Sequence, residues 1–437
     1  MPSRNIFTNK PHALRHGDFL PFLTVPHGKV DLVFEGNKFI DPQGNELVFR
    51  GLCLADPVKL VRDGQWTERI FAEAADWGAN IVRFAVHPAN INAMGWDATF
   101  EAMDQGIEWA KKHGLYVIMD WHSIGNLKDA KYTNPMYNTT LEETHKFWST
   151  AAERYKDEPT VALYEVFNEP TVTGPDTGSC TWEEWKAIQE QIIDTIRKHN
   201  PNAVCLCAGF NWAYDLTPVA YAPIERENVA YVSHPYPMKR EQPWEEQWEK
   251  DFGFVADKYP VICTEIGFCL EHEKGAHIPV ISTEVYGEHI TRYFEQKGIS
   301  FTVWCFDTDW SPTLIEDWNF TPSTQGRFFK AYLQQNPDIA DDLEQKIRDN
   351  AVKLMSPQAR AAAKALYSAG DSTLTPSTEV DEADLADGVI TLNRLLVLGK
   401  LVPSGSEGRR AIEQGGVSVD GEKVSDVKAL ITKEQLE

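Results

Sequence analysis

The chain has 437 residues with an apolar fraction of 42%, so it is longer than one average domain and can bury a sizeable core. Its formal net charge of −23 at pH 7 argues against nucleic acids and anionic membranes as partners of the whole chain and favours a neutral partner. No apolar run approaches the roughly 18 residues that a membrane-spanning helix needs.

The N-terminal segment, residues 1–29, is polar and gives no firm structural prediction. It lacks the apolar stretch of a signal peptide. The seven cysteines fall mainly in predicted strands and show no CxxC spacing, which is typical of buried thiols in a reducing compartment. We therefore expect a cytoplasmic protein; secretion is the alternative if a leader has been removed.

Residues 30–51 alternate apolar and polar side chains around a Gly-Asn and a Gln-Gly pair, which predicts β-hairpins. From there to residue 310, eight apolar runs alternate with amphipathic helical segments. Continuous apolar runs are typical of strands that are buried on both faces of a parallel sheet. The predicted strands are 47–54, 80–86, 115–121, 161–167, 203–209, 228–234, 261–267 and 300–306. Eight such βα units predict an α/β fold, a (β/α)8 TIM barrel whose floor is capped by the hairpins.

The clearest helix is predicted over 181–199. Thr181 and Glu184 have the spacing of a capping box, while Lys198, His199 and Pro201 are typical of a helix end. The last helix of the barrel is predicted to end near residue 335, so we place the barrel domain at 1–337.

Beyond the barrel the composition changes. A charged, Ala-rich stretch predicts a helical connector over 338–369, and a run rich in Ser, Thr, Pro and acidic residues predicts a linker over 370–386. Residues 387–437 then predict a small α+β domain. Within it, helical signals cover 389–401 and 404–416, and 417–424 has the pattern of a hairpin that turns at Asp420-Gly421.

The C-terminal ends of the strands of such a barrel face a shared pocket, so chemistry is sought there. Glu169 and Glu265 stand at the ends of the fourth and seventh predicted strands, which puts two carboxyl groups across one pocket. Paired carboxyl groups that flank one bond are the machinery of glycoside hydrolysis, in which one group stays protonated and the other stays ionised. Arg83 would supply that difference if it lies beside Glu265. Further residues at strand ends are His87, Asp120, Trp121, His122, Asn168, His234, Tyr236, Trp304 and Asp307.

Six stretches carry a resemblance to a known family: "NIVRF" (80–84), "MDWH" (119–122), "YEVFNEP" (164–170), "SHPY" (233–236), "VICTEIGF" (261–268) and "FTVWCF" (301–306). Their order resembles that in glycoside hydrolase family 5 of clan A, over roughly residues 30–336. The resemblance implies that Glu169 is the acid/base and Glu265 the nucleophile, in a retaining double displacement without a cofactor. It also implies carboxyl groups about 5 to 5.5 Å apart. The other pocket residues that it implies are Asn168 on the sugar 2-hydroxyl, Arg83 beside the nucleophile, and His122, His234, Tyr236 and Trp304.

Each of these motifs also has a plainer interpretation. A glutamate before proline often only ends a strand, and an arginine such as Arg83 more often forms a structural ion pair than a catalytic one. His87, His122 and His234 could instead bind zinc or iron in a hydrolytic barrel. No HxH or HExxH spacing occurs, however, so we expect no metal.

The substrate prediction depends on charge and on aromatic residues. Among the 14 tryptophans, Trp121, Trp212, Trp304 and Trp310 lie in or just after strand ends and are predicted to contact sugar. A neutral polysaccharide or oligosaccharide fits the acidic chain. Because family 5 contains many endoglucanases, we predict an endo-acting enzyme on β-1,4-glucan, with β-mannan and other β-glucans as alternatives.

A second resemblance covers residues 387–424, where "LVPSGSEGRRAIEQGGVSVDGEKV" (401–424) is similar to the S4-like RNA-binding module at the C-terminus of bacterial tyrosyl-tRNA synthetases. It implies contacts to an RNA backbone through Arg409, Arg410 and Lys423. Gly405 and Gly408 stand where that family usually has Lys and Ala. Residues 381–437 hold seven Lys or Arg against eleven Asp or Glu, which is a poor footprint for RNA. The alternative of a different class is an RNA-binding protein whose barrel is catalytically idle.

Overall fold

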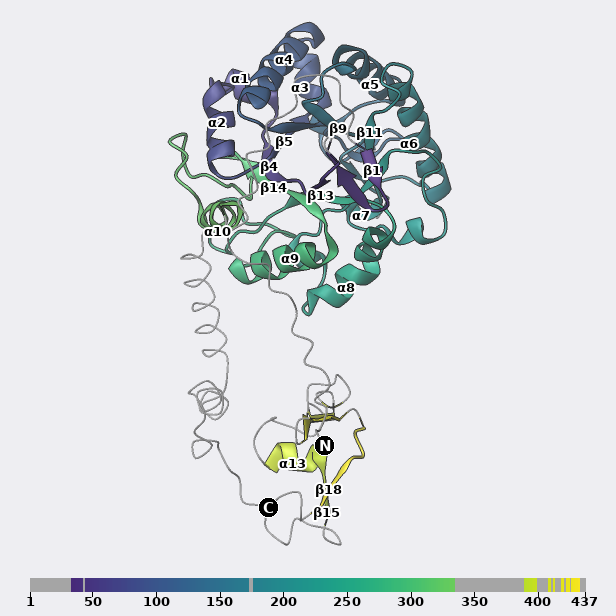
Figure 1. The fold of residues 1–437 in the computed structure, drawn as a ribbon, viewed down its shortest axis with the longest axis vertical. Helices are drawn as coiled ribbons and strands as arrows, with labels where there is room; N and C mark the ends of the chain where they lie inside the picture. Colours follow the sequence, from purple (N-terminus) through teal and green to yellow (C-terminus); the bar gives the residue numbers. More distant parts are fainter. Residues whose placement is uncertain are drawn as a thin grey trace, which may run out of the picture. The chain divides into compact units, whose positions relative to one another are not determined.

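The computed structural model describes residues 33–41, 44–172, 176–334 and 389–398, and short stretches between 408 and 432. The chain divides into two units, Met1–Pro337 and Asp338–Glu437 (Figure 1). The expected connector at 338–369 and linker at 370–386 lie outside the described residues. Among the helices of the described part, none is long and apolar enough to cross a membrane.

The first unit is built on a closed barrel of eight parallel strands, so the predicted TIM barrel is confirmed. Each strand falls within one of the predicted apolar runs. Every residue of the second, third, seventh and eighth barrel strands is buried, which explains why the runs are apolar throughout. The strands are β4 (Arg50–Leu54), β5 (Ile81–Val86), β6 (Tyr116–Trp121), β9 (Val161–Glu165), β11 (Val204–Ala208), β12 (Val229–Val232), β13 (Val261–Ile266) and β14 (Ser300–Phe306).

Helices form a ring around the strands (Figure 1). The predicted capping box is present in α6, where the Thr181 side chain accepts from the Glu184 amide and the Glu184 side chain from the Thr181 amide. The helices are α1 (Pro57–Arg62), α2 (Glu68–Asp76), α3 (Pro88–Met94), α4 (Trp96–Lys112), α5 (Leu141–Tyr155), α6 (Trp182–Arg197), α7 (Phe210–Ala213), α8 (Trp244–Asp251), α9 (Glu284–Lys297) and α10 (Thr324–Leu333). Short 3-10 turns are η1 (Pro135–Tyr137), η2 (Thr217–Ala220), η3 (Pro237–Lys239) and η4 (Gly253–Asp257).

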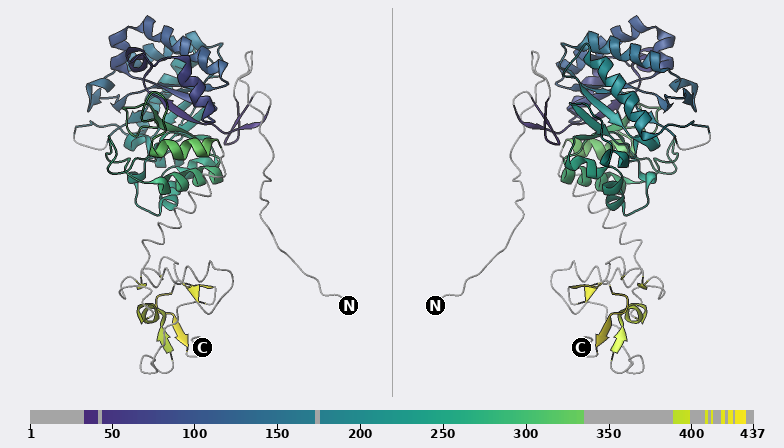
Figure 2. Two further views of the ribbon diagram at one scale, coloured as in Figure 1. Left: turned by 90° about the vertical axis from the view of Figure 1, so that its left-hand side faces the viewer. Right: turned by 90° about the vertical axis from the view of Figure 1, so that its right-hand side faces the viewer.

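The predicted hairpins form a small antiparallel sheet of β1 (Val33–Glu35), β2 (Lys38–Ile40) and β3 (Glu46–Leu47) at one end of the barrel (Figure 2). Phe39 and Leu47 from this sheet join Phe49 in one core cluster with residues that begin barrel strands, such as Ile81 and Tyr116. The sheet therefore closes the N-terminal end of the barrel and leaves the C-terminal ends of the strands for the pocket.

The second unit is a small α+β arrangement, as predicted. In it β15 (Val389–Thr391) pairs with β18 (Leu430–Thr432), and β16 (Ser418–Val419) pairs antiparallel with β17 (Glu422–Lys423). The predicted turn at Asp420-Gly421 lies outside the described residues. Helix α13 (Leu392–Leu398) begins three residues later than the helical signal at 389–401 indicated. The reason is that β-branched Val389, Ile390 and Thr391 pair as a strand. Ile390, Leu392, Leu396, Ile412 and Ile431 form its core.

Candidate active site

The two predicted glutamates lie together at the C-terminal end of the barrel. Glu265 is in β13, and Glu169 opens a short strand β10 (Glu169–Pro170) that pairs with β7 (Ile124–Asn126). β7 pairs in turn with β8 (Lys131–Tyr132), so this small sheet lies beyond the ends of β6 and β9. The Glu169 amide donates to the Ser123 carbonyl at 3.1 Å. A carboxylate and a proline thus follow the buried run "YEVF" because the chain leaves the barrel there and enters a second, smaller sheet.

Both carboxyl groups are buried, with residue exposures of 8% for Glu169 and 5% for Glu265. One oxygen of each lies within 4.8 Å of the other and of a His234 ring nitrogen. Such close oxygens are compatible with carboxyl groups about 5 to 5.5 Å apart, as in retaining glycosidases.

Arg83 lies beside Glu265, as the sequence led us to expect. Its Nη1 donates to Glu265 Oε1 at 2.9 Å, and its Nε and Nη2 bind both oxygens of Glu165 at 2.7 and 3.0 Å. Nη2 also lies 2.6 Å from Asn168 Oδ1 and 3.0 Å from Asp120 Oδ2. A fully buried guanidinium is therefore surrounded by three carboxyl groups, and burial together with the neighbouring carboxyl groups raises the pKa of Asp120 well above its usual value.

Glu165 was missed as a site residue by the sequence analysis. It is fully buried and accepts from Arg83 on one side and, through Oε1, from Thr264 Oγ1 at 2.8 Å on the other. A signal for it exists, because Glu165 is a carboxylate inside an otherwise apolar strand. A buried charge needs a partner, and the nearby strand β5 carries Arg83.

His234 links this network to Glu169. Its Nε2 lies 2.9 Å from Thr264 Oγ1 and its Nδ1 lies 2.9 Å from Glu169 Oε1. Since the Thr264 hydroxyl donates to Glu165, its oxygen must accept the proton of His234 Nε2. Burial lowers the pKa of His234 to about 4, so the ring is neutral near pH 7 and Nδ1 is an acceptor. The contact to Glu169 is then a hydrogen bond only when Glu169 is protonated and donates.

The two glutamates therefore have different surroundings. Burial raises the pKa of Glu169 to about 7, against the opposing charges of Lys239 and Arg83 and with the support of Glu165. Burial also raises the pKa of Glu265, which His234 and Arg83 oppose. Glu265 accepts from Arg83 and, at 2.9 Å, from the Tyr236 hydroxyl, and such donors stabilise the ionised form.

Aromatic rings line one side of the glutamate pair. The His122 ring is nearly parallel to Trp304, with centroids 5.1 Å apart at 12°, and His122 Nδ1 lies 2.6 Å from Asp120 Oδ2. Trp310 lies next to Trp304 with centroids 6.0 Å apart at 10°, and His87 packs 4.4 Å from His122. We call His87, His122, Trp304 and Trp310 the aromatic wall.

Two of the predicted sugar-contacting tryptophans lie elsewhere. Trp212, in α7, has a left-handed φ of 54° and holds its ring 5.0 Å from the ammonium of Lys239, away from the aromatic wall. The prediction for Trp121 is wrong: its side chain is fully buried, packs on Phe147 and donates to Thr144 Oγ1 of α5 at 3.1 Å. Successive strand residues alternate in direction, so Trp121 points toward the helix layer while Asp120 and His122 point into the barrel.

The side chains around the two glutamates are hydrogen-bonded to one another. Within the described residues, the group of side chains that could hold a metal ion is Glu169, His234 and Glu265. Both ring nitrogens of His234 are already hydrogen-bonded to neighbours, and His122 Nδ1 faces Asp120. Asn168 is buried and its Nδ2 has no partner among the described residues, which leaves a free donor next to Arg83.

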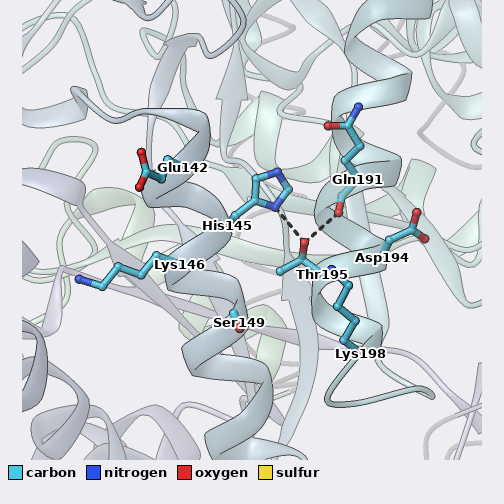
Figure 3. A pocket seen from close by; sticks show the side chains of 8 residues that line it. All are labelled: Glu142, His145, Lys146, Ser149, Gln191, Asp194, Thr195 and Lys198. Atoms are coloured by element: carbon cyan, nitrogen blue, oxygen red, sulfur yellow. Dashed lines mark hydrogen bonds between the residues drawn. The ribbon is translucent and has the colours of Figure 1, made fainter.

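A separate hollow lies outside the barrel, between α5 and α6 (Figure 3). His145 Nδ1 lies 2.9 Å from Thr195 Oγ1 there, and Thr195 in turn donates to the Gln191 carbonyl. None of the residues predicted for the site lines this hollow. The strand ends, rather than the helix layer, therefore hold the site.

Comparisons with known proteins agree with this location. Residues 40–309 match the model of "Cellulase (glycosyl hydrolase family 5)", and residues 374–436 match that of "Tyrosine--tRNA ligase SYY-like C-terminal domain". The crystal structure of the native form of β-glucanase SdGluc5_26A from Saccharophagus degradans is 44% identical, covers 75% of this chain and 98% of its own, and gives a TM-score of 0.69. A second crystal structure of that β-glucanase, in complex with cellotetraose, is 43% identical with the same coverage and TM-score.

Curated relatives are more distant. Endoglucanase A of Butyrivibrio fibrisolvens is 26% identical over 211 residues, 47% of this chain and 45% of that protein. Endoglucanase E-5 of Thermobifida fusca is 24% identical over 315 residues, 68% of this chain and 59% of that protein. The chain thus spans about half the length of these two relatives. Because the cellulase model matches more than half of the chain, over the strands that carry both glutamates, the chain belongs to glycosyl hydrolase family 5.

Proposed function

We propose that the barrel is a retaining endo-β-1,4-glucanase that acts by double displacement through Glu169 and Glu265. The observation that carries the proposal is the pair of buried carboxyl groups within 4.8 Å of each other, one in contact with a neutral histidine and the other held by Arg83 and Tyr236. Family membership and a 44% identical β-glucanase support the same activity.

In the first step Glu265 attacks the anomeric carbon of the sugar. Its carboxylate is held at one oxygen by Arg83 Nη1 and at the other by the Tyr236 hydroxyl, so its orientation is fixed before substrate enters. Glu169 gives its proton to the glycosidic oxygen as the bond to the leaving sugar breaks. The products are a glycosyl ester on Glu265 and a free sugar chain.

In the second step water replaces the departed sugar. Glu169, now ionised, takes a proton from the water, which attacks the anomeric carbon, breaks its bond to the Glu265 oxygen and frees Glu265 as a carboxylate. A pKa of about 7 lets Glu169 serve first as an acid and then as a base near neutral pH.

The substrate follows from the pocket and from the relatives. Asn168 Nδ2 has no partner among the described residues and is a ready donor to the 2-hydroxyl of the sugar under attack. Trp304 in the aromatic wall offers an apolar face for that ring. A β-glucanase with cellotetraose bound among the similar structures favours glucan over mannan, whose 2-hydroxyl is axial.

RNA binding by the second unit and a cytoplasmic location stay predictions. Arg409 is exposed, Arg410 lies outside the described residues, and only the backbone of Lys423 is described. We propose that the barrel carries the reaction and that the second unit is a folded appendage.

The test is the release of reducing ends from soluble carboxymethyl-cellulose by the intact protein and by Glu265→Gln, with glucomannan and β-mannan alongside. We expect activity on the glucan that falls on the order of 10⁴-fold in the variant. Activity confined to mannan would contradict the substrate and keep the mechanism. Inactivity on all three would contradict the proposed function.

A further inference from the structure

The two glutamates divide the mouth of the barrel into a smaller and a larger side. In the order of the strands, β11 and β12 lie between β9, which precedes Glu169, and β13, which carries Glu265; β14, β4, β5 and β6 complete the circle on the other side (Figure 1). The aromatic wall lies on the larger side. Trp212 and Lys239, which follow β11 and β12, lie on the smaller one.

Lys239 is the unusual residue of the smaller side. It ends η3, three residues after Tyr236, and it is half-buried. Its ammonium donates to the Asn211 carbonyl at 2.9 Å and lies 5.0 Å from the ring centroid of Trp212. A lysine ammonium has three hydrogens to donate, so among the described residues this contact leaves two of them free.

The other half-buried or buried lysines of the described residues form ion pairs with carboxylates. In the described part of the chain there are five besides Lys239, and each has a carboxylate oxygen within 3.3 Å: Lys59, Lys111, Lys186, Lys297 and Lys330. No carboxylate of the described residues lies within the 4.0 Å of an ion pair with Lys239. A half-buried lysine without a carboxylate partner is unusual in a chain with a net charge of −23.

The position of Lys239 relative to the pair is asymmetric. Its ammonium donates to the Asn211 carbonyl of α7, and α7 packs against β10, the short strand that Glu169 opens. The ammonium therefore lies on the side of Glu169, where its charge opposes the upward shift that burial gives the pKa of that carboxyl group. In the mechanism proposed above, that carboxyl group faces the oxygen of the leaving sugar, whereas Glu265 faces the carbon under attack.

We propose that Lys239 binds the leaving-group sugar, the unit that departs in the first step, by donating to its hydroxyl groups beside Trp212. The inference rests on the proposed function and adds a residue that sets leaving-group preference. The sugar hydroxyls take the two donors that the protein leaves free, and the ring of Trp212 limits where the sugar can lie.

Two substrates with the same two-glucose glycone test this role. Cellotetraose releases a sugar, whereas 2,4-dinitrophenyl β-cellobioside releases a phenolate that needs neither a proton nor sugar contacts. Lys239→Met keeps the stem against Trp212 and removes the charge and its donors. We expect kcat/KM to fall about 10- to 100-fold for cellotetraose and less than about threefold for the aryl glycoside. Lys250→Met, an exposed lysine of α8, is the matched control and should leave both values unchanged.

A second readout does not depend on how much of each variant is folded. With the aryl glycoside as donor and added cellobiose as acceptor, the acceptor must occupy the leaving-group side to attack the glycosyl enzyme. The ratio of transfer to hydrolysis should fall about tenfold in Lys239→Met and be restored in part by Lys239→Arg. Equal losses on both substrates, or an unchanged ratio, would overturn the inference. A wild-type chain that cleaves neither substrate would instead overturn the proposed function, and the inference with it.

Discussion

At the scale of single residues, the site works because similar groups have different neighbours. Glu169 and Glu265 are both buried, but Glu265 accepts from Arg83 and Tyr236 while Glu169 contacts the neutral ring of His234. The carboxyl groups of Glu265, Glu165 and Asp120 gather around one guanidinium. In the proposed mechanism proton donation falls to Glu169, whose carboxyl group contacts a neutral histidine instead.

The pH dependence of hydrolysis follows from this difference. Glu169 must be protonated in the first step, and its pKa is about 7, so kcat/KM on a soluble glucan should fall as the pH rises through about 7. The titratable and charged groups that interact with Glu169 include His234, Glu265, Glu165, Arg83, Lys239, Asp120, Tyr137 and Tyr236. A pH profile of kcat/KM measures this fall directly. Activity that stays level to pH 9 would contradict the assignment of Glu169 as the acid.

The same pKa predicts an effect on stability. A glutamate in the unfolded chain has a pKa of about 4.3. Its folded pKa of about 7 means that the wild type loses stability as the pH rises from the first value through the second, because a buried carboxyl group must ionise. Glu169→Gln removes this loss. It should be more stable than the wild type by up to about 4 kcal/mol at pH 8 and differ little at pH 4, in urea unfolding at each pH.

Glu265→Gln is the comparison variant. Burial raises the pKa of Glu265 as well, so its ionisation also costs stability, but its carboxyl group faces a buried guanidinium whose charge the substitution leaves less neutralised. At pH 8 Glu265→Gln should therefore gain less stability than Glu169→Gln. A Glu169→Gln variant that is less stable than the wild type at pH 8 would show that Glu169 is ionised in the folded protein without such a cost.

At the scale of elements, what the sequence could predict was set by local pattern. Eight apolar runs predicted eight strands, and strand ends predicted Glu169 and Glu265, because both features depend only on neighbours along the chain. The prediction that Trp121 contacts sugar was wrong. Side chains alternate in direction along β6, so Trp121 and His122 point to opposite sides, and this alternation could have corrected the prediction. Lys239 lies in a turn after β12 and was not predicted as a site residue. Loops lack the repeating side-chain pattern of strands and helices, so the sequence does not show where their side chains point.

A helix also positions the site from a distance. Gln325 of α10 is buried, donates from Nε2 to the carbonyls of Trp304 and Pro312 at 2.9 and 2.7 Å, and accepts from the Phe268 amide at 2.9 Å. It thus joins the segments that follow β13 and β14, and it holds the backbone of Trp304.

Gln325→Ala should leave two buried backbone groups, the Phe268 amide and the Trp304 carbonyl, without the partner that this side chain provides, whereas the Pro312 carbonyl still accepts from the Cys305 amide. We expect the free energy of unfolding to fall by about 3 kcal/mol and kcat on glucan to fall as Trp304 moves. Gln334→Ala is the matched control, because that exposed side chain donates to the Asp76 carbonyl at the end of the same helix; it should cost less than about 1 kcal/mol. The free energy of unfolding and kcat on glucan, measured for both variants, test this prediction. Equal losses in the two variants would contradict the role of Gln325 in positioning Trp304.

At the scale of the whole molecule, two units with different relatives share one chain. The barrel holds every residue that we assign to the reaction, and the second unit has its own small core. Residues 381–437 carry an excess of acidic over basic side chains, within a chain of net charge −23. Binding to RNA depends on neutralised phosphates and so gains little from this composition.

A chain that ends at residue 337 should therefore keep its glucanase activity. The first unit, Met1–Pro337, ends there, and all contacts described for Glu169, Glu265 and Arg83 are made within it. We expect kcat/KM on soluble glucan within about twofold of the full chain, since no group of the reaction is removed. The full chain serves as the control, and circular dichroism confirms that the short form is folded. A folded but inactive short form would show that the second unit completes the site, whereas salt-sensitive RNA binding by an inactive full chain would favour the RNA-binding alternative.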